Sequence, residues 1–598
     1  MSATLRQTWD LESLFPGGSK SDKLRATVQA LQEDLNELLP QLRAAGGAAD
    51  ASHALAGFIL AAENISARLA EATSFVGCLQ AQDVDDKLAD QWNGRVNELS
   101  ALDETAWTLL EGLLAKLDEP SWMELRALPD MAPIAFALHE ARQIALEKLD
   151  ADREILITDL AIDGYHAWEN LRDAVVGRMK ITVEENGEKT VLSVGQADNE
   201  LDSPDRSRRE AVFRAWTQSW SDEAQLCSLA LNHIGGFRLH VYGHRGWEDV
   251  LQEPLRRNRM SRETLDAMWQ AVDESKAALV RYLERKARLI GVDRLSWHDV
   301  EAPLTTDAVA KNVTYEEARD FIVKHFASFS EDMAAFAHQC FERAWIEAED
   351  RPGKRPGGFC TSLPVSGQTR IFLTYAGVPS SVSTLAHEIG HAYHQHVMEG
   401  MPYLAQQYAM NVAETASTLA ELIVSSAALA QTQGSGSRIA MLDDKLRRSV
   451  AFLMDIHARF AFESAFYEKR RQGMLSVEEL NAMMLHAQQE SYRGALGEYH
   501  PEFWASKLHF YITNPPFYNF PYTFGYLFSA GVYAEGKRQG APFAARYVDL
   551  LRDTGSMTVE DLAQKHLRAD LRQPDFWRSA TAVALADLEE FLRATDDM

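Results

Sequence analysis

The segment T-L-A-H-E-I-G-H-A-Y-H-Q-H, residues 384–396, lies in an amphipathic stretch that runs from about residue 381 to 399. A glycine directly after this stretch is typical of a helix end. His387 and His391, four residues apart, fall on one face of such a helix, with Cβ atoms about 5 to 6 Å apart. Both imidazoles can therefore bind one tetrahedral metal ion.

Glu388 lies one position round the helix from this pair, so it cannot join the same two-ligand row. It can instead lean over an open coordination site and accept a proton from water, as the general base of a zinc hydrolase does. The H-E-x-x-H pattern also arises by chance. Its context favours the functional interpretation, because it lies in an amphipathic helix, after a predicted edge strand and before a second long helix that carries acids.

A catalytic zinc site needs a third protein ligand and leaves a fourth position open. The continuation H-x-x-G-x-x-H would require glycine and histidine where this chain has His394 and Val397. The other known solution is a carboxylate on the next helix, and M-N-V-A-E-T-A-S-T-L-A-E-L-I-V-S-S, residues 410–426, offers Glu414 and Glu421. Their small and apolar neighbours predict a buried face, where a carboxylate needs a partner. We expect Glu414 to bind the metal and Glu421 to support the site or to pack between helices.

Two more histidines, His394 and His396, follow the pair on the same helix. His387 and His391 already supply the two imidazole ligands of the predicted metal site. These two are therefore expected to support the ligands or to lie on the surface.

Helix-period apolar residues dominate the first 175 positions, and long helices are also predicted at about 404–431, 437–472 and 476–493. Between them, residues 178–194 alternate apolar and polar side chains around Asn-Gly, which predicts a β-hairpin. This hairpin is our predicted seam between a helical lobe, 1–200, and a catalytic domain, 201–598.

The composition is that of an ordinary globular protein, with 598 residues, 46% hydrophobic and 25% charged. The formal net charge of −27 repels phosphate and anionic lipid, so we expect neither a nucleic acid nor a membrane as partner. Four scattered cysteines and an opening without a signal-like apolar run predict reduced thiols and a cytoplasmic location.

Taken together, T-L-A-H-E-I-G-H-A-Y-H-Q-H, N-V-A-E-T-A-S-T-L-A-E and a carboxy-terminal His and Tyr cluster resemble the thimet oligopeptidase and oligoendopeptidase F family of zinc metallopeptidases. The opening T-W-D-L-E-S-L-F and residues 286–304 resemble the oligoendopeptidase F branch, so the resemblance spans nearly the whole chain. It implies a mainly α fold of two helical lobes flanking a deep substrate channel, with active-site helices of the zincin type and a small β-sheet. Such a channel admits short, unstructured peptides.

Carried over by motif, the resemblance makes His387, His391 and Glu414 the ligands of one Zn²⁺ per chain and Glu388 the catalytic base. In the aromatic segment 507–531, most rings are expected to pack in the core.

Within that segment, His509, Tyr518 and Tyr522 match family positions that donate hydrogen bonds to the peptide and to its developing oxyanion. Phe520 stands where relatives often have a further tyrosine, which leaves open which of the two tyrosines acts.

The loop Gly357-Gly358-Phe359 and a predicted edge strand at 370–375 resemble the family's substrate-binding segment. Glycines allow close approach of a backbone, and an unpaired strand edge can hydrogen-bond an extended peptide. A plain connector is the alternative interpretation of this segment.

These observations predict a zinc-dependent endopeptidase that hydrolyses internal bonds of short oligopeptides. One alternative is an exopeptidase of the same architecture that releases dipeptides from a carboxyl terminus, which would need a cation to bind the terminal carboxylate. Another is a catalytically silent peptide-binding protein. The complete set of three ligands plus Glu388 counts against the last, since a structural zinc site would have a fourth protein ligand.

Overall fold

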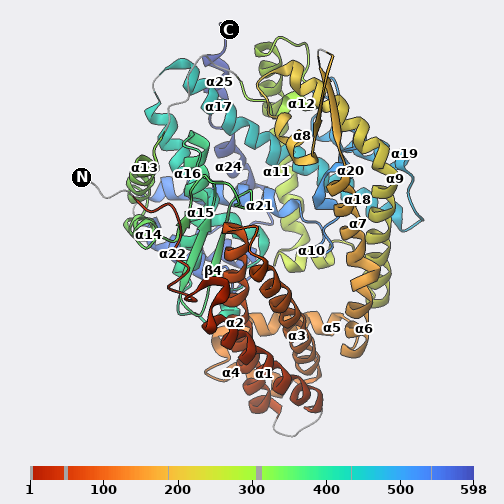
Figure 1. Ribbon diagram of the computed structural model, residues 1–598, viewed down its shortest axis with the longest axis vertical. Helices are drawn as coiled ribbons and strands as arrows, with labels where there is room; N and C mark the ends of the chain where they lie inside the picture. The colour runs from red at the N-terminus through yellow and green to blue at the C-terminus, as the bar shows by residue number, and fades with distance from the viewer. Residues whose placement is uncertain (1–4, 46–50, 186, 305–312, 433, 541) are drawn as a thin grey trace. The chain divides into compact units, whose positions relative to one another are not determined.

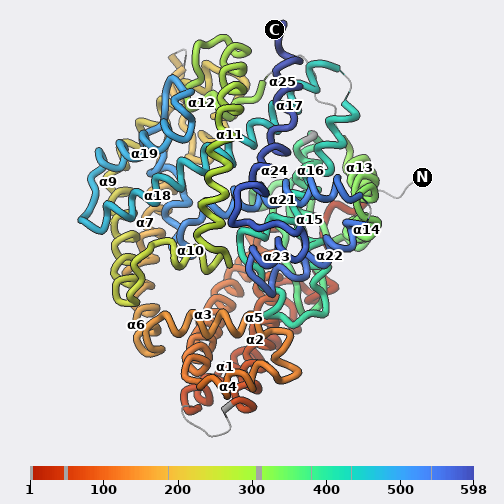
Figure 2. Tube along the Cα trace, turned by 180° about the vertical axis from the view of Figure 1, so that it is seen from behind, coloured from red at the N-terminus to blue at the C-terminus, as the bar shows by residue number. Residues whose placement is uncertain are grey.

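Helices form most of the secondary structure in the computed structural model, which describes residues 5–45, 51–185, 187–304, 313–432, 434–540 and 542–598 (Figures 1 and 2). The strands of this described part form one two-stranded and one three-stranded sheet. The predicted mainly α fold with a small β-sheet is therefore confirmed.

The chain folds into two compact units, each built from three segments. Unit 1 comprises Met1–Ile157, Ala310–Ala427 and Glu535–Arg568, and unit 2 comprises Thr158–Val309, Ala428–Ala534 and Ala569–Met598. This division follows packing rather than chain order, because segments far apart in sequence share a core. The consecutive domains 1–200 and 201–598 stay a prediction.

In unit 1, the amino-terminal helices pack through rows of leucines. The helices of this unit are α1 (Asp22–Ala44), α2 (Ala51–Gln82), α3 (Lys87–Lys116), α4 (Glu119–Ala127), α5 (Ala135–Glu147), α13 (Tyr315–Ala327), α14 (Glu331–Glu342), α15 (Pro379–Val397), α22 (Phe543–Asp553) and α23 (Val559–Leu567). The Ser21 side chain caps α1 by accepting a hydrogen bond from the Leu24 amide. Helical spacing then places the apolar residues of α1 on one buried face: Leu24, Val28, Leu31, Leu35, Leu38, Leu39 and Leu42. Figure 1 shows α1, α2 and α3 lying side by side.

The three-stranded sheet of unit 1 has the order β3 (Ile346–Glu347), β5 (Gln368–Phe372), β4 (Phe359–Leu363). β5 runs parallel to β3 and antiparallel to β4. The predicted edge strand at 370–375 is therefore wrong in its position, because its β-forming residues lie in the central strand β5. In the described sheet, β4 is an outer strand, and it begins at Phe359, the last residue of the glycine loop.

Helix α15 packs closely on α16 (Met410–Gln431) because Gly390 has no side chain. A Cβ atom at Gly390 would lie 2.6 Å from the Ala416 carbonyl oxygen and 2.6 Å from the Ser417 Cα. These atoms belong to the backbone of α16, so a larger residue would force the helices apart. The contact brings the start of α16 next to the His387 face of α15.

Helix α16 is also long and apolar enough to cross a membrane by length and composition alone. In this fold, 61% of its most apolar window is buried inside the protein, and the helix carries Glu414 and Glu421. Its apolar character therefore has an explanation in core packing. The sequence predicted that this helix begins at about residue 404. It begins instead at Met410, because Tyr403–Gln406 form a separate 3₁₀ turn.

Unit 2 is built around two long helices, α9 (Arg206–Arg245) and α11 (Arg262–Leu289). Its shorter helices are α7 (Ala167–Arg178), α8 (Val194–Glu200), α10 (Gln252–Arg257), α12 (Trp297–Val300), α17 (Ser435–Val450), α18 (Ile456–Arg470), α19 (Val477–Ser491), α20 (Phe503–Ser506), α24 (Pro574–Ala584) and α25 (Leu588–Ala594). Figure 2 shows α24 lying beside α11. Three helices cross the unit boundaries: α6 (Ala151–Ala161), α16 and α21 (Phe520–Gln539).

The predicted hairpin is confirmed in unit 2. Strands β1 (Ile181–Glu185) and β2 (Glu188–Leu192) pair antiparallel, with Ile181 opposite Leu192. Ile181 and Val183 are buried while Thr182 and Glu184 are exposed, as the alternation of side chains requires.

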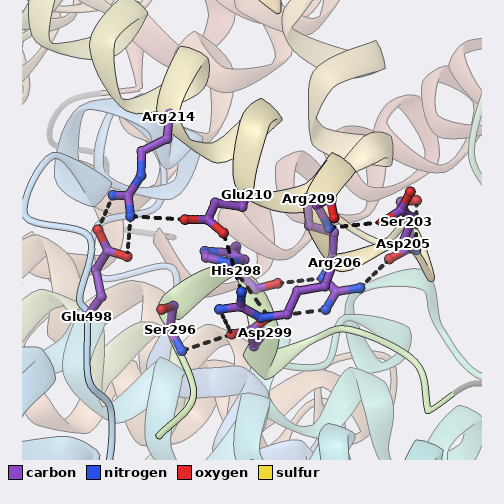
Figure 3. A network of polar contacts seen from close by, with 11 residues as sticks. Ser203, Asp205, Arg206, Arg209, Glu210, Arg214, Ser296, His298, Asp299 and Glu498 are labelled. Carbon is purple, nitrogen blue, oxygen red and sulfur yellow. Dashed lines mark hydrogen bonds and ion pairs between the residues drawn. The ribbon is translucent and has the colours of Figure 1, made fainter. Parts of the chain in front are cut away.

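A buried ion-pair network ties the start of α9 to α12 (Figure 3). Asp299, fully buried, accepts hydrogen bonds from Arg206 and Arg209 at 3.1 Å each and from the Ser296 amide at 3.1 Å. Arg209 is itself only 2% exposed and also donates to the His298 carbonyl. Burial would raise the pKa of Asp299, but His298, the Ser296 amide and the two arginines outweigh it and lower the pKa.

Replacing Asp299 by asparagine is expected to destabilise the protein by about 3 to 5 kcal/mol, because the Arg209 guanidinium would stay buried without a carboxylate. The urea midpoint of the full chain, followed by circular dichroism, measures the loss. Glu210→Gln is the matched control, since the Glu210 side chain is 44% exposed and its pair with Arg206 should contribute at most ~1 kcal/mol. Equal losses in the two variants would contradict the structural role of Asp299.

Candidate metal centre

Three predicted ligands, His387, His391 and Glu414, meet in unit 1. One ligand atom from each lies within 4.8 Å of the others, and among the described residues this is the one such group of three. The Glu414 Oε2 atom lies 3.4 Å from His387 Nε2 and 3.5 Å from His391 Nε2. The two imidazole rings stand nearly perpendicular, at 82°, with centroids 4.9 Å apart.

These separations suit a metal ion better than hydrogen bonds. They exceed the 2.7 to 3.2 Å of an N–H···O bond. Zinc bound at about 2.0 to 2.1 Å with tetrahedral angles places neighbouring ligand atoms ~3.3 Å apart. The donor set of two imidazoles and one carboxylate is also that of known catalytic zinc sites. The three side chains are 21 to 27% exposed, which leaves one side of the group open to solvent.

Glu421, one predicted supporting residue, approaches His387 from the far side of the ring. Its Oε2 atom lies 3.4 Å from His387 Nδ1, while His387 Nε2 faces Glu414. A carboxylate at Nδ1 orients the imidazole and favours the tautomer that leaves Nε2 free to bind a metal.

Ser417 is a supporting residue that sequence reasoning missed. Its hydroxyl is fully buried and donates a 2.7 Å hydrogen bond to Glu414 Oε2, the same oxygen that faces both histidines. The spacing Glu-x-x-Ser could have indicated the contact, because residues three apart share a helix face. A serine there is otherwise an ordinary helix residue, so the signal was weak.

Replacing Ser417 by alanine is expected to weaken Zn²⁺ binding by ~10- to 100-fold, since Glu414 would lose the bond that orients it. Competition with a chromophoric chelator measures the dissociation constant. Ser425→Ala is the control, because that hydroxyl, on the same helix, contacts the Leu422 carbonyl. If both variants bind Zn²⁺ like the parent, Ser417 does not position the carboxylate.

Glu388 follows His387 on α15, but it is not one of the three residues of the metal group. It is 6% exposed, and its Oε2 has no hydrogen-bond partner in the described structure. Burial raises the pKa of Glu388 to about 7, although His387 nearby lowers it. A buried carboxyl with a free oxygen and a pKa near neutrality can accept and return a proton.

The glycine loop leads into the free edge of β4, next to Glu388. Gly357 has a φ of +96°, which favours glycine, and a Cβ atom at Gly358 would lie 3.3 Å from Glu388 Oε1. The Phe359 ring is partly buried and stacks on Phe372 at 5.2 Å between centroids. Its part in substrate binding stays a prediction.

His394 and His396 lie outside the metal group. His394 is fully buried, and its Nε2 lies 2.9 Å from Thr554 Oγ1, next to the end of α22. The surface alternative is thus wrong for His394, because its ring faces the helix-packing side of α15. His396 is partly exposed, with its ring stacked on Phe336 at 4.4 Å.

His509, Tyr518 and Tyr522 lie in unit 2, where their rings form one cluster. Centroid distances are 5.5 Å from His509 to Tyr518, 6.0 Å from His509 to Tyr522 and 5.8 Å between the tyrosines. Burial, followed by Arg459 and other cations nearby, lowers the pKa of His509 to about 3, so this imidazole is neutral. Phe520, at the start of α21, is fully buried in the core.

Comparisons with known proteins agree with this structure. The model of peptidase family M3 matches residues 200–583, and that of the oligopeptidase F amino-terminal region matches residues 114–181. Oligopeptidase PepF of Bacillus subtilis is 23% identical over 604 residues, covering 98% of this chain and 87% of the relative. The chromosomal oligoendopeptidase F of Lactococcus lactis is 24% identical over 407 residues, covering 66% of this chain and 65% of the relative.

Solved structures show the same fold. A crystal structure of a peptidase from Chlamydophila abortus superposes with a TM-score of 0.82 at 20% identity and covers 98% of both chains. Oligoendopeptidase-F from Enterococcus faecium superposes with a TM-score of 0.71 at 19% identity, over 95% of this chain and 99% of that one. The predicted resemblance is confirmed, and the family model spans the histidine pair and Glu414. The chain belongs to peptidase family M3 and is a metallo-oligopeptidase.

Proposed function

We propose that this peptidase is a zinc-dependent endopeptidase that cuts internal bonds of short, unstructured oligopeptides. His387, His391 and Glu414 would hold one Zn²⁺ per chain, and Glu388 would act as general base. The observation that carries the proposal is the approach of Glu414 Oε2 to both imidazoles, at 3.4 and 3.5 Å, beside a carboxyl that is not part of the group. When bound, the ion supplies Lewis-acid chemistry for a carbonyl and for water.

Glu388 would take the proton of the attacking water and pass it to the leaving amine. Its raised pKa suits both transfers, because a base near neutrality can also serve as the acid. Its position one residue after His387 holds the carboxyl beside the ligands while leaving it outside the ligand set.

The peptide would extend along the free edge of β4. An extended chain can add to such an edge through main-chain hydrogen bonds, which makes binding largely independent of sequence. Gly357 and Gly358 would let the peptide backbone come near Glu388, since a side chain at Gly358 would contact that carboxyl.

His509, Tyr518 and Tyr522 would donate hydrogen bonds to the peptide and to the developing oxyanion. Family resemblance motivates this assignment, and the clustering of the three rings supports it. We also propose a cytoplasmic enzyme with short peptides as its partners. The net charge of −27 and four free cysteines support that location.

Cleavage of a mixed peptide library by the Zn²⁺-loaded enzyme tests the function. Mass spectrometry should find cuts at internal bonds of peptides of roughly ten residues, chelation should abolish them and Zn²⁺ should restore them. Exclusive release of dipeptides from carboxyl termini would identify the exopeptidase instead. Peptide binding without any hydrolysis by the loaded protein would identify the silent binding protein.

A further inference from the structure

The opening T-W-D-L-E-S-L-F, residues 8–15, begins in a segment that lies along the outer side of β3 in unit 1. The Gln7 carbonyl accepts a hydrogen bond of 2.7 Å from the Ala348 amide, just after β3. The Asp10 amide donates at 2.6 Å to the Ala344 carbonyl, just before β3. The segment therefore runs in the direction opposite to β3 and covers its outer edge.

Trp9 is held in this segment through its backbone and its ring. It is 3% exposed, and its amide donates at 3.2 Å to Glu347 Oε2. Its indole Nε1 donates at 2.8 Å to Gln82 Oε1, at the end of α2. The carbonyl of the next residue, Asp10, accepts two hydrogen bonds from the buried Arg370 guanidinium, at 2.9 and 2.6 Å. These contacts fix the position of the indole in unit 1.

The Trp9 ring packs against two phenylalanines of the sheet. Its centroid lies 5.6 Å from that of Phe372 and 6.4 Å from that of Phe359, with the Phe359 ring edge-on. Phe359 ends the glycine loop and begins β4, while Phe372 ends β5. Aromatic pairs at such distances are favourable. The Phe359 ring is therefore held by two other rings, one of which comes from the amino-terminal segment.

The position of Gly358 depends on that of Phe359, the residue that follows it. A Cβ atom at Gly358 would lie 3.3 Å from Glu388 Oε1 and 3.4 Å from the Phe372 carbonyl oxygen. The backbone of the glycine loop thus passes close to the candidate general base. A displaced Phe359 ring would move this backbone and the start of β4 relative to Glu388.

Lys354 holds the other side of the glycine loop and shares two partners with Trp9. Its Nζ atom lies 3.5 Å from Glu347 Oε1 and 4.7 Å from the centroid of the Phe372 ring. It also donates a hydrogen bond of 2.9 Å to the Leu373 carbonyl, and its side chain is 3% exposed. Since Trp9 contacts both Glu347 and Phe372, loss of the indole should also loosen the Lys354 side chain.

We propose that Trp9 is a positioning residue for peptide binding. Its indole holds Phe359, and through Phe359 it holds the glycine loop and the outer strand β4 beside Glu388. The inference rests on the proposed function, in which the peptide extends along β4. All the residues that carry it belong to unit 1. It gives the opening motif a part in the site, although this motif supplies no metal ligand.

Replacing Trp9 by leucine is expected to raise the KM of the Zn²⁺-loaded enzyme for a peptide of about ten residues by at least ~5-fold. The kcat should change by less than ~2-fold, because the peptide-binding strand is displaced while the metal ligands are retained. Trp9→Phe should keep a nearly parental KM, since it leaves an aromatic ring against Phe359. Trp122→Leu is the matched control, because Trp122 is a tryptophan of unit 1 that is 2% exposed and packs against Arg126 and Arg142. It should lose stability without a change in KM.

Limited digestion with trypsin reports the position of the loop without any hydrolysis by the enzyme itself. Trypsin must take the Lys354 side chain into its specificity pocket, and this side chain is 3% exposed in the folded protein. The bonds after Arg351 and Arg355 precede prolines and resist trypsin. Trp9→Leu should therefore raise the rate of cleavage after Lys354 by at least ~10-fold, as mapped by mass spectrometry. Trp9→Phe and Trp122→Leu should not.

A parental KM in the Trp9→Leu enzyme would overturn the proposal, and so would an unchanged rate of cleavage after Lys354. Equal rises of KM in Trp9→Leu and Trp122→Leu would also overturn it, because they would reflect a general loss of stability. If none of these proteins hydrolyses a peptide while Trp9→Leu still exposes Lys354 to trypsin, the proposed function fails and the role of Trp9 in holding the loop stands.

Discussion

Replacing Glu388 by glutamine is expected to lower kcat for a quenched fluorescent peptide of about ten residues by at least ~10²-fold, while the protein keeps its zinc. Glutamine has the same shape but cannot accept the proton of water. Glu388 is not part of the group formed by His387, His391 and Glu414, so the Glu388→Gln substitution should not cause loss of the zinc. Because the substrate is bound by other residues, KM should change much less than kcat.

Elemental analysis of the dialysed Glu388→Gln protein checks that the zinc content is unchanged, and stopped assays give the rate. Glu399→Gln is the matched control, because Glu399 follows the same helix and is 42% exposed at its contact with His396. That variant should turn over peptide at the parental rate. Undiminished turnover by the Glu388 variant, with zinc bound, would refute its role as general base.

Replacing Glu414 by alanine is expected to remove zinc altogether. Two histidines on one helix would remain, and a catalytic zinc site requires three protein ligands. The loss of affinity should exceed the ~10- to 100-fold expected when only a supporting residue is removed. After exhaustive dialysis, metal analysis should find close to one zinc per parental chain and almost none in the variant.

Glu421→Ala is the companion variant, since that carboxylate approaches His387 at Nδ1 rather than at Nε2. It should retain zinc with reduced affinity. If Glu421→Ala loses the metal and Glu414→Ala keeps it, the two acids have the opposite roles. Circular dichroism of both variants separates loss of the metal from loss of the fold.

The arrangement of the candidate site could be predicted in part. The spacing of His387 and His391 follows from the helix repeat. Of the two acids on the next helix, Glu414 was the expected ligand and Glu421 the expected supporting residue. The Glu-x-x-Ser spacing gave only a weak signal for the hydrogen bond from Ser417 to Glu414, because serine is otherwise an ordinary residue of a helix. The order of the strands in the three-stranded sheet could not be predicted either, because β propensity identifies a strand but not the strands beside it.

By itself, the sequence determined what depends on near neighbours in the chain: the long helices, the hairpin at Ile181–Leu192, and two imidazoles with a carboxyl beside them on one helix. Backbone hydrogen bonds set these spacings, whatever the rest of the chain does. The tertiary structure decided which groups from distant segments meet. Glu414 reaches the histidines because Gly390 lets α15 and α16 pack closely. Such contacts depend on packing between elements, which no local pattern encodes.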